Sequence, residues 1–300
     1  MSSQGSTSTE TGAGPLGLIA GAGRFPFLVA DGARRAGRPV AAIGLKGLTD
    51  PALRDHVDYF RWSGVVRLGT WIRVLRRQGV SEAIMAGSVR KSDMYCRFRL
   101  LRFIPDWTSI RLWFFEVSDR RNDTILRAAA DHMARKGITL TNSIRYCPDA
   151  LPGPGVLTRR QPTPAQQKDI EFGWRIAKEM GRLDIGQSIA VKEQEVIAVE
   201  AIEGTDRMIE RAGQLCRHGG WMLIKVAKPG QDLRFDIPTV GPTTIENLSR
   251  HRASALVFEA GQTLVVDREE MLKEADRLGI VVVAVEGCST GTSSDTMQDR

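Results

Sequence analysis

Short apolar runs that alternate with amphipathic helical stretches are the feature that most constrains this chain. The pattern predicts strands over residues 16–20, 39–45 and 82–86, and helices over residues 25–36 and 71–78. Strand, helix and strand of these lengths are typical of right-handed βαβ units around a parallel sheet. We therefore expect an α/β fold whose first domain is Rossmann-like.

A proline-rich stretch divides the chain. Residues 148–164 (PDALPGPGVLTRRQPTP) contain five prolines and two glycines, too many for a helix or a central strand. Two α/β domains follow from this division: an N-terminal Rossmann-like domain over 15–150, a linker over 151–164, and a C-terminal catalytic domain with a mixed sheet over 165–287. The small, polar ends, 1–14 and 288–300, predict disordered tails.

The second half combines an expected hairpin with further helices and strands. The hairpin joins 188–192 to 195–201 around Glu193-Gln194. Helices are predicted over 165–180, 204–214 and 243–251, and strands over 221–226, 255–258, 263–266 and 280–285. We expect Asp267 to cap a last helix that runs to residue 278, because aspartate is a preferred N-cap residue.

Charge and cysteine content limit the class of protein. The 300 residues contain 42 Lys and Arg against 35 Asp and Glu, a net charge of +7. A mild surplus of this kind suits an acidic partner such as a phosphate or an anionic lipid surface without choosing between them. The four cysteines have no metal-ligand spacing, so we expect a reducing compartment rather than a zinc site. No apolar run approaches the roughly 20 residues that cross a bilayer.

A glycine pair follows the first predicted strand. Gly21 and Gly23 lie at the junction with the next helix, where backbone N–H groups and the helix N-terminus favour an anion. The third glycine of a dinucleotide fingerprint is absent, which makes an NAD-dependent oxidoreductase the weaker alternative. A tight turn that binds nothing explains the pair equally well.

Two polar segments of the second half suggest phosphate chemistry. The loop over 225–241 carries Lys225, Lys228 and Asp236, and phosphoryl transfer requires both cations and a carboxylate. A solvated turn capped by Asp236 is the alternative.

The second of these segments is acidic. It contains Glu200, Glu203 and Asp206, which could ligate a hard cation. Alternatively, Thr205 or Asp206 caps the following helix. The run over 184–187, which ends in Gln187, could add polar groups beside them.

An aromatic and basic segment covers residues 94–115. It contains seven of the nineteen aromatic residues, interleaved with four arginines. This composition suits the headgroup level of a membrane or a groove for acyl chains, and an ordinary core helix fits equally well. Single-stranded nucleic acid fits it less well, and we expect no nucleic-acid partner.

Four runs in order resemble the LpxI family of UDP-2,3-diacylglucosamine pyrophosphatases. They are GLIAGAGRFP, RLDIGQSIAVKEQEVIAVEAIEGTD, KVAKPGQDLRFDIPTVG and EAGQTLVVDRE, and the resemblance covers nearly all of 15–287. It implies hydrolysis of the substrate pyrophosphate to UMP and 2,3-diacylglucosamine 1-phosphate in lipid A biosynthesis, with Mg²⁺ or another divalent cation such as Mn²⁺. It also implies two α/β domains with the lipid held between them, a homodimer, and a peripheral location at the cytoplasmic face of the inner membrane.

The resemblance assigns roles to individual residues. Asp236 and Lys228 become catalytic, with Asp236 holding the metal or positioning water. The implied substrate-binding residues are Gly21, Gly23, Gln187, Lys225 and Thr239, and the implied metal ligands besides Asp236 are Glu200, Glu203 and Asp206. Arg121-Asn122-Asp123 departs from the Gly-Asp-Asp usual in relatives, which removes a carboxylate and adds a cation. A non-catalytic lipid- or nucleotide-sugar-binding protein of envelope biogenesis is the rival hypothesis.

Overall fold

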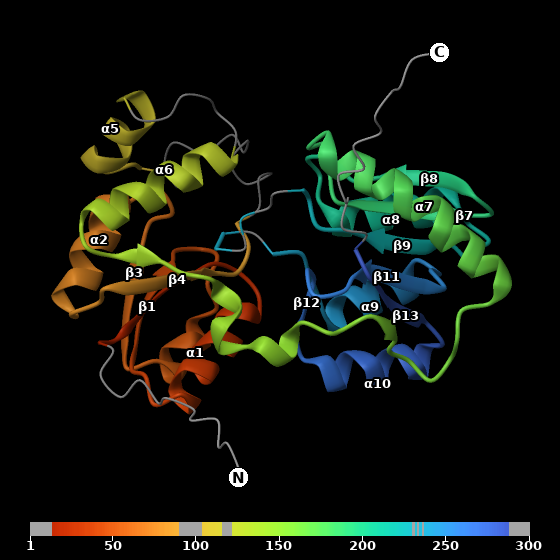
Figure 1. Cartoon of the computed structure of the whole chain (residues 1–300), viewed down its shortest axis with the longest axis horizontal. Helices are drawn as coiled ribbons and strands as arrows, with labels where there is room; N and C mark the ends of the chain where they lie inside the picture. Colours follow the sequence, from red (N-terminus) through yellow and green to blue (C-terminus); the bar gives the residue numbers. More distant parts are fainter. Residues whose placement is uncertain are drawn as a thin grey trace, which may run out of the picture. The chain divides into compact units, whose positions relative to one another are not determined.

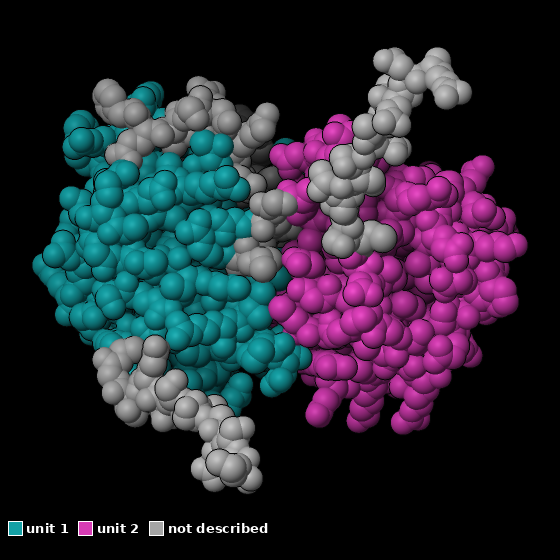
Figure 2. Space-filling view, in the orientation of Figure 1, with its two compact units in different colours: residues 1–150, 202–204, 230–237 teal, residues 151–201, 205–229, 238–300 magenta. Residues whose placement is uncertain are grey.

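The computed structural model describes two compact units. The described residues are 14–89, 104–115, 122–229, 232, 234–235 and 237–287. Unit 1 contains residues 1–150, 202–204 and 230–237, and unit 2 contains residues 151–201, 205–229 and 238–300 (Figure 2). Two short segments of the second half of the sequence therefore belong to unit 1.

Unit 1 is built on a parallel sheet. Among the described residues its strand order is β3-β2-β1-β4-β5 (Figure 1). The strands are β1 (Leu16–Ala20), β2 (Val40–Leu45), β3 (Tyr59–Ser63), β4 (Glu82–Ala86) and β5 (Thr139–Leu140). The chain runs outward from β1 in both directions, so the doubly wound switch point lies between β1 and β4. This topology confirms the predicted Rossmann-like first domain.

Helices cover both faces of this sheet (Figure 1). They are α1 (Phe25–Arg35), α2 (Leu68–Arg77), α5 (Trp107–Phe115) and α6 (Asn122–Arg135), with short 3₁₀ turns η1 (Pro51–His56), η2 (Ser143–Tyr146) and η3 (Pro148–Ala150). Trp71 of α2, Leu112 of α5 and Met133 of α6 share one core with the sheet. Helix α1 packs against β1, β2 and β4 outside that core.

One carboxylate connects α2 and α5. Asp106 Oδ2 accepts a hydrogen bond of 2.8 Å from the Thr70 backbone N–H, and its Oδ1 accepts one of 3.0 Å from the Ser109 backbone N–H. Burial raises the pKa of Asp106, but hydrogen bonds from Ser109, Thr70 and Gly69 outweigh it and hold this pKa below its usual range. Asp106 therefore accepts hydrogen bonds from backbone N–H groups in the first turns of two helices, where such groups have no partner within the helix.

Unit 2 is built on a mixed sheet, as predicted. Its described strand order is β6-β13-β11-β9-β7-β8. The strands are β6 (Gly155–Val156), β7 (Ser188–Lys192), β8 (Glu195–Val199), β9 (Met222–Lys225), β11 (Ala255–Glu259) and β13 (Val281–Val285). Strands β9, β11 and β13 run parallel, whereas β7 runs antiparallel to β8 and β9. A separate parallel pair joins β10 (Thr239–Val240) to β12 (Leu264–Val265).

The helices of unit 2 enclose its sheet on both faces. Helix α7 (Pro164–Arg182) packs on one face through Ile170 and Ala177. Helices α8 (Thr205–Leu215), α9 (Pro242–Arg250) and α10 (Arg268–Leu278) share the core on the other face. Of the helices in the described ranges, none has the length and apolar character that crossing a bilayer requires.

The predicted hairpin is confirmed, and Asp169 explains its turn. Glu193 and Gln194 have φ angles of 53° and 59°, which suit a two-residue hairpin turn but strain residues with a side chain. The buried Asp169 carboxylate accepts hydrogen bonds from both backbone N–H groups, at 3.0 and 2.7 Å. A residue from α7 therefore stabilises a turn that contains no glycine.

Several boundaries differ from the sequence prediction. Strand β6 lies within the stretch expected as a linker and pairs at the sheet edge, where a proline-rich segment is tolerated. Asp267 is the N-cap residue of α10, and this helix ends at Leu278, as predicted. The φ angle of Asp267 is 47°, and its side chain makes no capping hydrogen bond. Strands β3 and β5 were not predicted.

We expect Asp106→Ala to lower the free energy of unfolding by about 2 kcal/mol at neutral pH, because two helices lose a cap. Because the pKa of Asp106 is lower in the folded state, the ionised carboxylate stabilises the fold at pH values above its pKa in the unfolded chain, which is about 4. This stabilisation is lost as the pH falls through the pKa of Asp106 in the folded protein. The difference between wild type and variant should therefore narrow in acid. Urea unfolding at several pH values measures it, with exposed Asp55→Ala as a control that changes stability by less than about 0.5 kcal/mol. Equal losses for the two variants would contradict the double cap.

Candidate functional site

Buried polar side chains gather where β9 ends in unit 2. Lys225 is the last residue of β9, and Ser188 at the start of β7 pairs with it across the sheet. Glu200 follows β8 directly, and its backbone N–H donates to the Ser188 carbonyl at 2.8 Å. Because β7 runs antiparallel to both neighbours, its first residue lies beside the last residues of β8 and β9.

The hydroxyl of Thr205 connects these groups. Thr205 Oγ1 donates to Glu200 Oε1 at 3.0 Å and accepts from Lys225 Nζ at 3.4 Å. It also lies 3.4 Å from Ser188 Oγ. Glu200 and Lys225 are each 7% exposed. An acid and a base are thus linked through one hydroxyl inside the protein; Glu200, Thr205, Lys225 and Ser188 are called the polar cluster below.

Two side-chain oxygens at the polar cluster, one of Glu200 and one of the neighbouring Gln187, lack hydrogen-bond donors among the described residues. Glu200 Oε2 and Gln187 Oε1 are buried and have no hydrogen-bond partner among the residues that the structure describes. The backbone carbonyl oxygen of Gln187, unlike its side-chain oxygen, does have a donor. It accepts a hydrogen bond of 2.9 Å from the Val226 backbone N–H, which holds Gln187 at the end of β9. A buried acceptor without a donor costs roughly 1–3 kcal/mol. Oxygens of this kind can be satisfied by a bound cation or by the donors of a ligand.

Gly186 allows the backbone approach that positions Glu200. A Cβ atom at Gly186 would lie 2.0 Å from the Glu200 carbonyl oxygen, which is far inside van der Waals contact. Because the obstacle is backbone rather than a flexible side chain, only glycine fits here.

An ion pair with a buried carboxylate fixes the segment that follows β9. Lys178 Nζ of α7 donates to Glu259 Oε1 at 2.9 Å, and the Ala227 backbone N–H donates to Glu259 Oε2 at 2.8 Å. Lys228, one residue further on, forms an ion pair with Asp184. The chain leaving β9 is therefore held from two sides.

The structure brings together part of the predicted site. Lys225 Nζ donates to the Thr239 carbonyl at 3.2 Å, and Glu200 and Gln187 lie at the same sheet edge. Thr205, named with Asp206 as an alternative cap of the following helix, is the first residue of α8, and its hydroxyl donates to Glu200. The member of the polar cluster that the sequence patterns did not indicate is Ser188, the first residue of an apolar strand.

The other predicted metal ligands are less buried than Glu200 or lie outside the described residues. Glu203 belongs to unit 1, whereas Asp206 is exposed on α8 and accepts a hydrogen bond from Asn247 at 3.4 Å. Asp236 lies outside the described residues, as do Arg121 and the side chains of Asn122 and Asp123. The described ranges contain no group of three His, Cys, Asp or Glu side chains placed to share a metal ion.

The segment over 230–237 belongs to unit 1, and three of its described residues make side-chain contacts. Phe235 packs against the core of that unit, and Arg234 forms a 2.6 Å ion pair with Asp232. Hydrogen bonding from Arg234 holds the pKa of Asp232 below its usual range, and Arg127 of α6 adds to the effect. The chain thus passes from unit 2 into unit 1 and back on either side of this segment.

The predicted glycine pair lies at the switch point of unit 1. The Gly21 backbone N–H donates to the Ala86 carbonyl at 2.8 Å, and Ala22 and Ser88 exchange two backbone hydrogen bonds of 2.9 Å. A Cβ atom at Gly21 would lie 2.8 Å from the Ser88 carbonyl oxygen. Close approach of two loops therefore accounts for Gly21 without a ligand. Gly23 is exposed with φ 94°, and its substrate-binding role stays a prediction.

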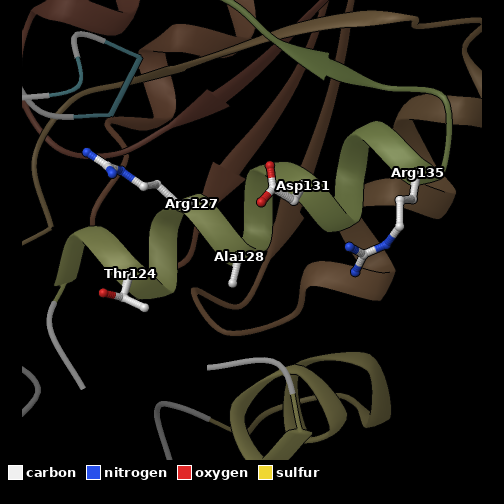
Figure 3. A pocket seen from close by; sticks show the side chains of 5 residues that line it. All are labelled: Thr124, Arg127, Ala128, Asp131 and Arg135. Atoms are coloured by element: carbon white, nitrogen blue, oxygen red, sulfur yellow. The ribbon is translucent and has the colours of Figure 1, made fainter. Parts of the chain in front are cut away.

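A surface hollow of about 690 Å³ lies along α6 in unit 1. Figure 3 shows Arg127 and Asp131 on one side of this helix and Ala128 and Arg135 on the other. None of the described residues of the predicted site lines this hollow.

Comparisons with known proteins agree with the resemblance. The LpxI N-terminal domain family matches residues 15–150, and the LpxI C-terminal domain family matches residues 153–283. The UDP-2,3-diacylglucosamine pyrophosphatase LpxI of Caulobacter vibrioides is 33% identical over 283 residues, which is 90% of this chain and 97% of that protein. These matches cover both units and run almost end to end, and the chain therefore belongs to the LpxI family.

Proposed function

We propose that the chain hydrolyses the pyrophosphate bond of UDP-2,3-diacylglucosamine to UMP and 2,3-diacylglucosamine 1-phosphate. The Caulobacter relative carries the name of this activity. The observation that carries the proposal is the polar cluster, in which a buried lysine and a buried glutamate hydrogen-bond to the same threonine hydroxyl at one end of the unit 2 sheet.

The residues of unit 2 suit a diphosphate. Buried Lys225 and partly buried Lys228 supply positive charge that neutralises non-bridging phosphate oxygens. Water attacks one phosphorus in line, the bond from that phosphorus to the bridging oxygen breaks, and the other phosphate leaves with that oxygen. Hydrogen bonds from Lys225 to Thr205 and to the Thr239 carbonyl already hold its ammonium group in place. The side chain therefore needs little rearrangement when the phosphates bind, which lowers the free-energy cost of the reaction.

A divalent cation such as Mg²⁺ or Mn²⁺ is part of the proposal. Glu200 Oε2 supports it, since this buried carboxylate oxygen lacks a donor among the described residues and would make a suitable ligand. When bound, such a cation would neutralise charge on the phosphates. Asp236 enters as a further ligand through its motif alone.

The proposal also includes a homodimer and a peripheral place at the cytoplasmic face of the inner membrane, both implied by the family. The substrate chemistry supports the second element, because a diacylated sugar partitions into a bilayer.

The direct test incubates the protein with UDP-2,3-diacylglucosamine and follows UMP. We expect UMP release that EDTA stops and that Mg²⁺ or Mn²⁺ restores, because phosphate charge must be neutralised. UDP-glucose, which lacks acyl chains, is the matched control and should be hydrolysed at least about tenfold more slowly, since remote binding energy is lost. Binding of the lipid without UMP release under any cation would favour the non-catalytic binding protein.

We expect Asp236→Ala to abolish UMP release while binding of the lipid substrate persists, because the motif assigns this carboxylate to the metal or to the attacking water. Turnover and equilibrium binding measured on the same preparation separate the two effects. Asp55→Asn, an exposed carboxylate of unit 1, should keep turnover within about twofold. Near wild-type turnover of the Asp236 variant would remove this residue from the mechanism.

A further inference from the structure

Helix α5 exposes an apolar face. Leu112 is its buried contact with the core of unit 1, whereas Trp107 and Phe114 are 78% and 73% exposed. Trp107 and Phe114 are seven residues apart, so their side chains project from the same side of the helix, opposite Leu112. Arg111 is the one charged residue of α5. Exposed large apolar groups on a common face mark an interaction site rather than random exposure.

The Asp106 carboxylate holds this face in place. It accepts hydrogen bonds from the first turns of both α2 and α5, and Leu112 packs in the core that α2 shares. Docking of the exposed face would therefore not require the helix to form first, which removes an ordering cost.

A basic hollow borders the same helix. Its volume is about 500 Å³, and its lining includes Arg73, Arg76 and Arg77 of α2, His132 and Lys136 of α6, and Thr108 of α5. None of its described lining residues is acidic. The arginines are exposed and lie on the side of α2 opposite its buried residues.

We infer that the α5 face and the basic hollow form one docking surface for an anionic lipid bilayer. Trp107 and Phe114 enter the boundary between headgroups and acyl chains, and the arginines bind headgroup phosphates. This inference deepens the proposed function at its membrane-association step and does not depend on hydrolysis. It assigns that step to particular side chains of unit 1.

Charge complementarity selects a bilayer over other partners. An acidic headgroup layer satisfies the arginines, while the apolar layer directly beneath it buries the two rings. Single-stranded nucleic acid stacks its bases on aromatics interleaved with cations along its path. Here the three arginines of the hollow lie on α2, whereas the two exposed rings lie on α5, where Arg111 is the one charged residue. This separation suits two layers of different polarity.

The test measures co-sedimentation with vesicles of equal parts phosphatidylglycerol and phosphatidylcholine, and with phosphatidylcholine alone. We expect binding to the anionic vesicles that is stronger by about tenfold or more and that weakens with salt. Arg73→Gln/Arg76→Gln/Arg77→Gln should weaken it by roughly a hundredfold, because each basic residue contributes about a factor of five. The matched control Lys168→Gln/Arg175→Gln/Arg250→Gln removes the same charge from exposed positions of unit 2 and should change binding by less than about fivefold.

The aromatic part has its own variants. Trp107→Ser/Phe114→Ser should weaken binding by at least about tenfold, whereas Trp107→Tyr/Phe114→Leu should retain most of it, because apolar area is what enters the bilayer. Leu215→Ser, 63% exposed on α8, is the control and should leave binding unchanged. Equal binding to both kinds of vesicle, wild-type binding by the α2 or α5 variants, or displacement of the vesicles by a single-stranded oligonucleotide would overturn the inference.

A water-soluble, short-chain UDP-diacylglucosamine separates the two proposals. Without vesicles the docking variants should hydrolyse it within about twofold of wild type, since the changed residues belong to unit 1 and the polar cluster belongs to unit 2. If wild type releases no UMP from any substrate yet binds anionic vesicles, the proposed function fails and the docking surface stands. If wild type releases UMP but does not bind anionic vesicles, the docking surface fails and the proposed function stands.

Discussion

The burial of a glutamate and a lysine at the same end of the unit 2 sheet is the constraint on which the candidate site depends. Glu200 and Lys225 are almost inaccessible to solvent, and each would be costly to bury alone. The Thr205 hydroxyl connects them by donating to one and accepting from the other. This arrangement exists because β7 is inserted antiparallel beside β9, which brings the ends of β8 and β9 and the start of β7 to one edge. Gly186 then permits the close backbone approach at Glu200.

Much of the fold could be predicted from local sequence. The apolar runs and the helical pattern of unit 1 identify βαβ units because each strand and helix leaves a periodic signature. The hairpin of unit 2 was also predictable, because two short strand-like runs flank Glu193-Gln194. Its turn was harder, because Glu193 and Gln194 are stabilised from a distance by Asp169 on α7. Strands β3 and β5 carry weak signatures, since β5 contains only two residues.

The site was predictable only in part. Lys225 and Glu200 stand out because charges at the ends of apolar strands need a partner. Lys178 and Glu259 fix the segment after β9. They are 81 residues apart in the sequence, so no local pattern predicts that they pair. Glu259 did leave one signal, as the charged last residue of an otherwise apolar strand. Gly21 shows the opposite case, because a motif typical of anion binding is explained by contact with the Ser88 backbone.

The central claim is that Lys225 and Thr205 act as one unit on the substrate diphosphate, and a double-mutant cycle tests it most directly. kcat/KM for UDP-2,3-diacylglucosamine would be measured for Lys225→Met, Thr205→Val and the combined variant, with Thr205→Ser as the variant that keeps the hydroxyl. We expect each single change to cost roughly 10- to 100-fold, Thr205→Ser to stay within a few-fold of wild type, and the combined variant to be little worse than Lys225→Met. Losses in kcat/KM that simply multiply would contradict the claim that Lys225 and Thr205 act as one unit.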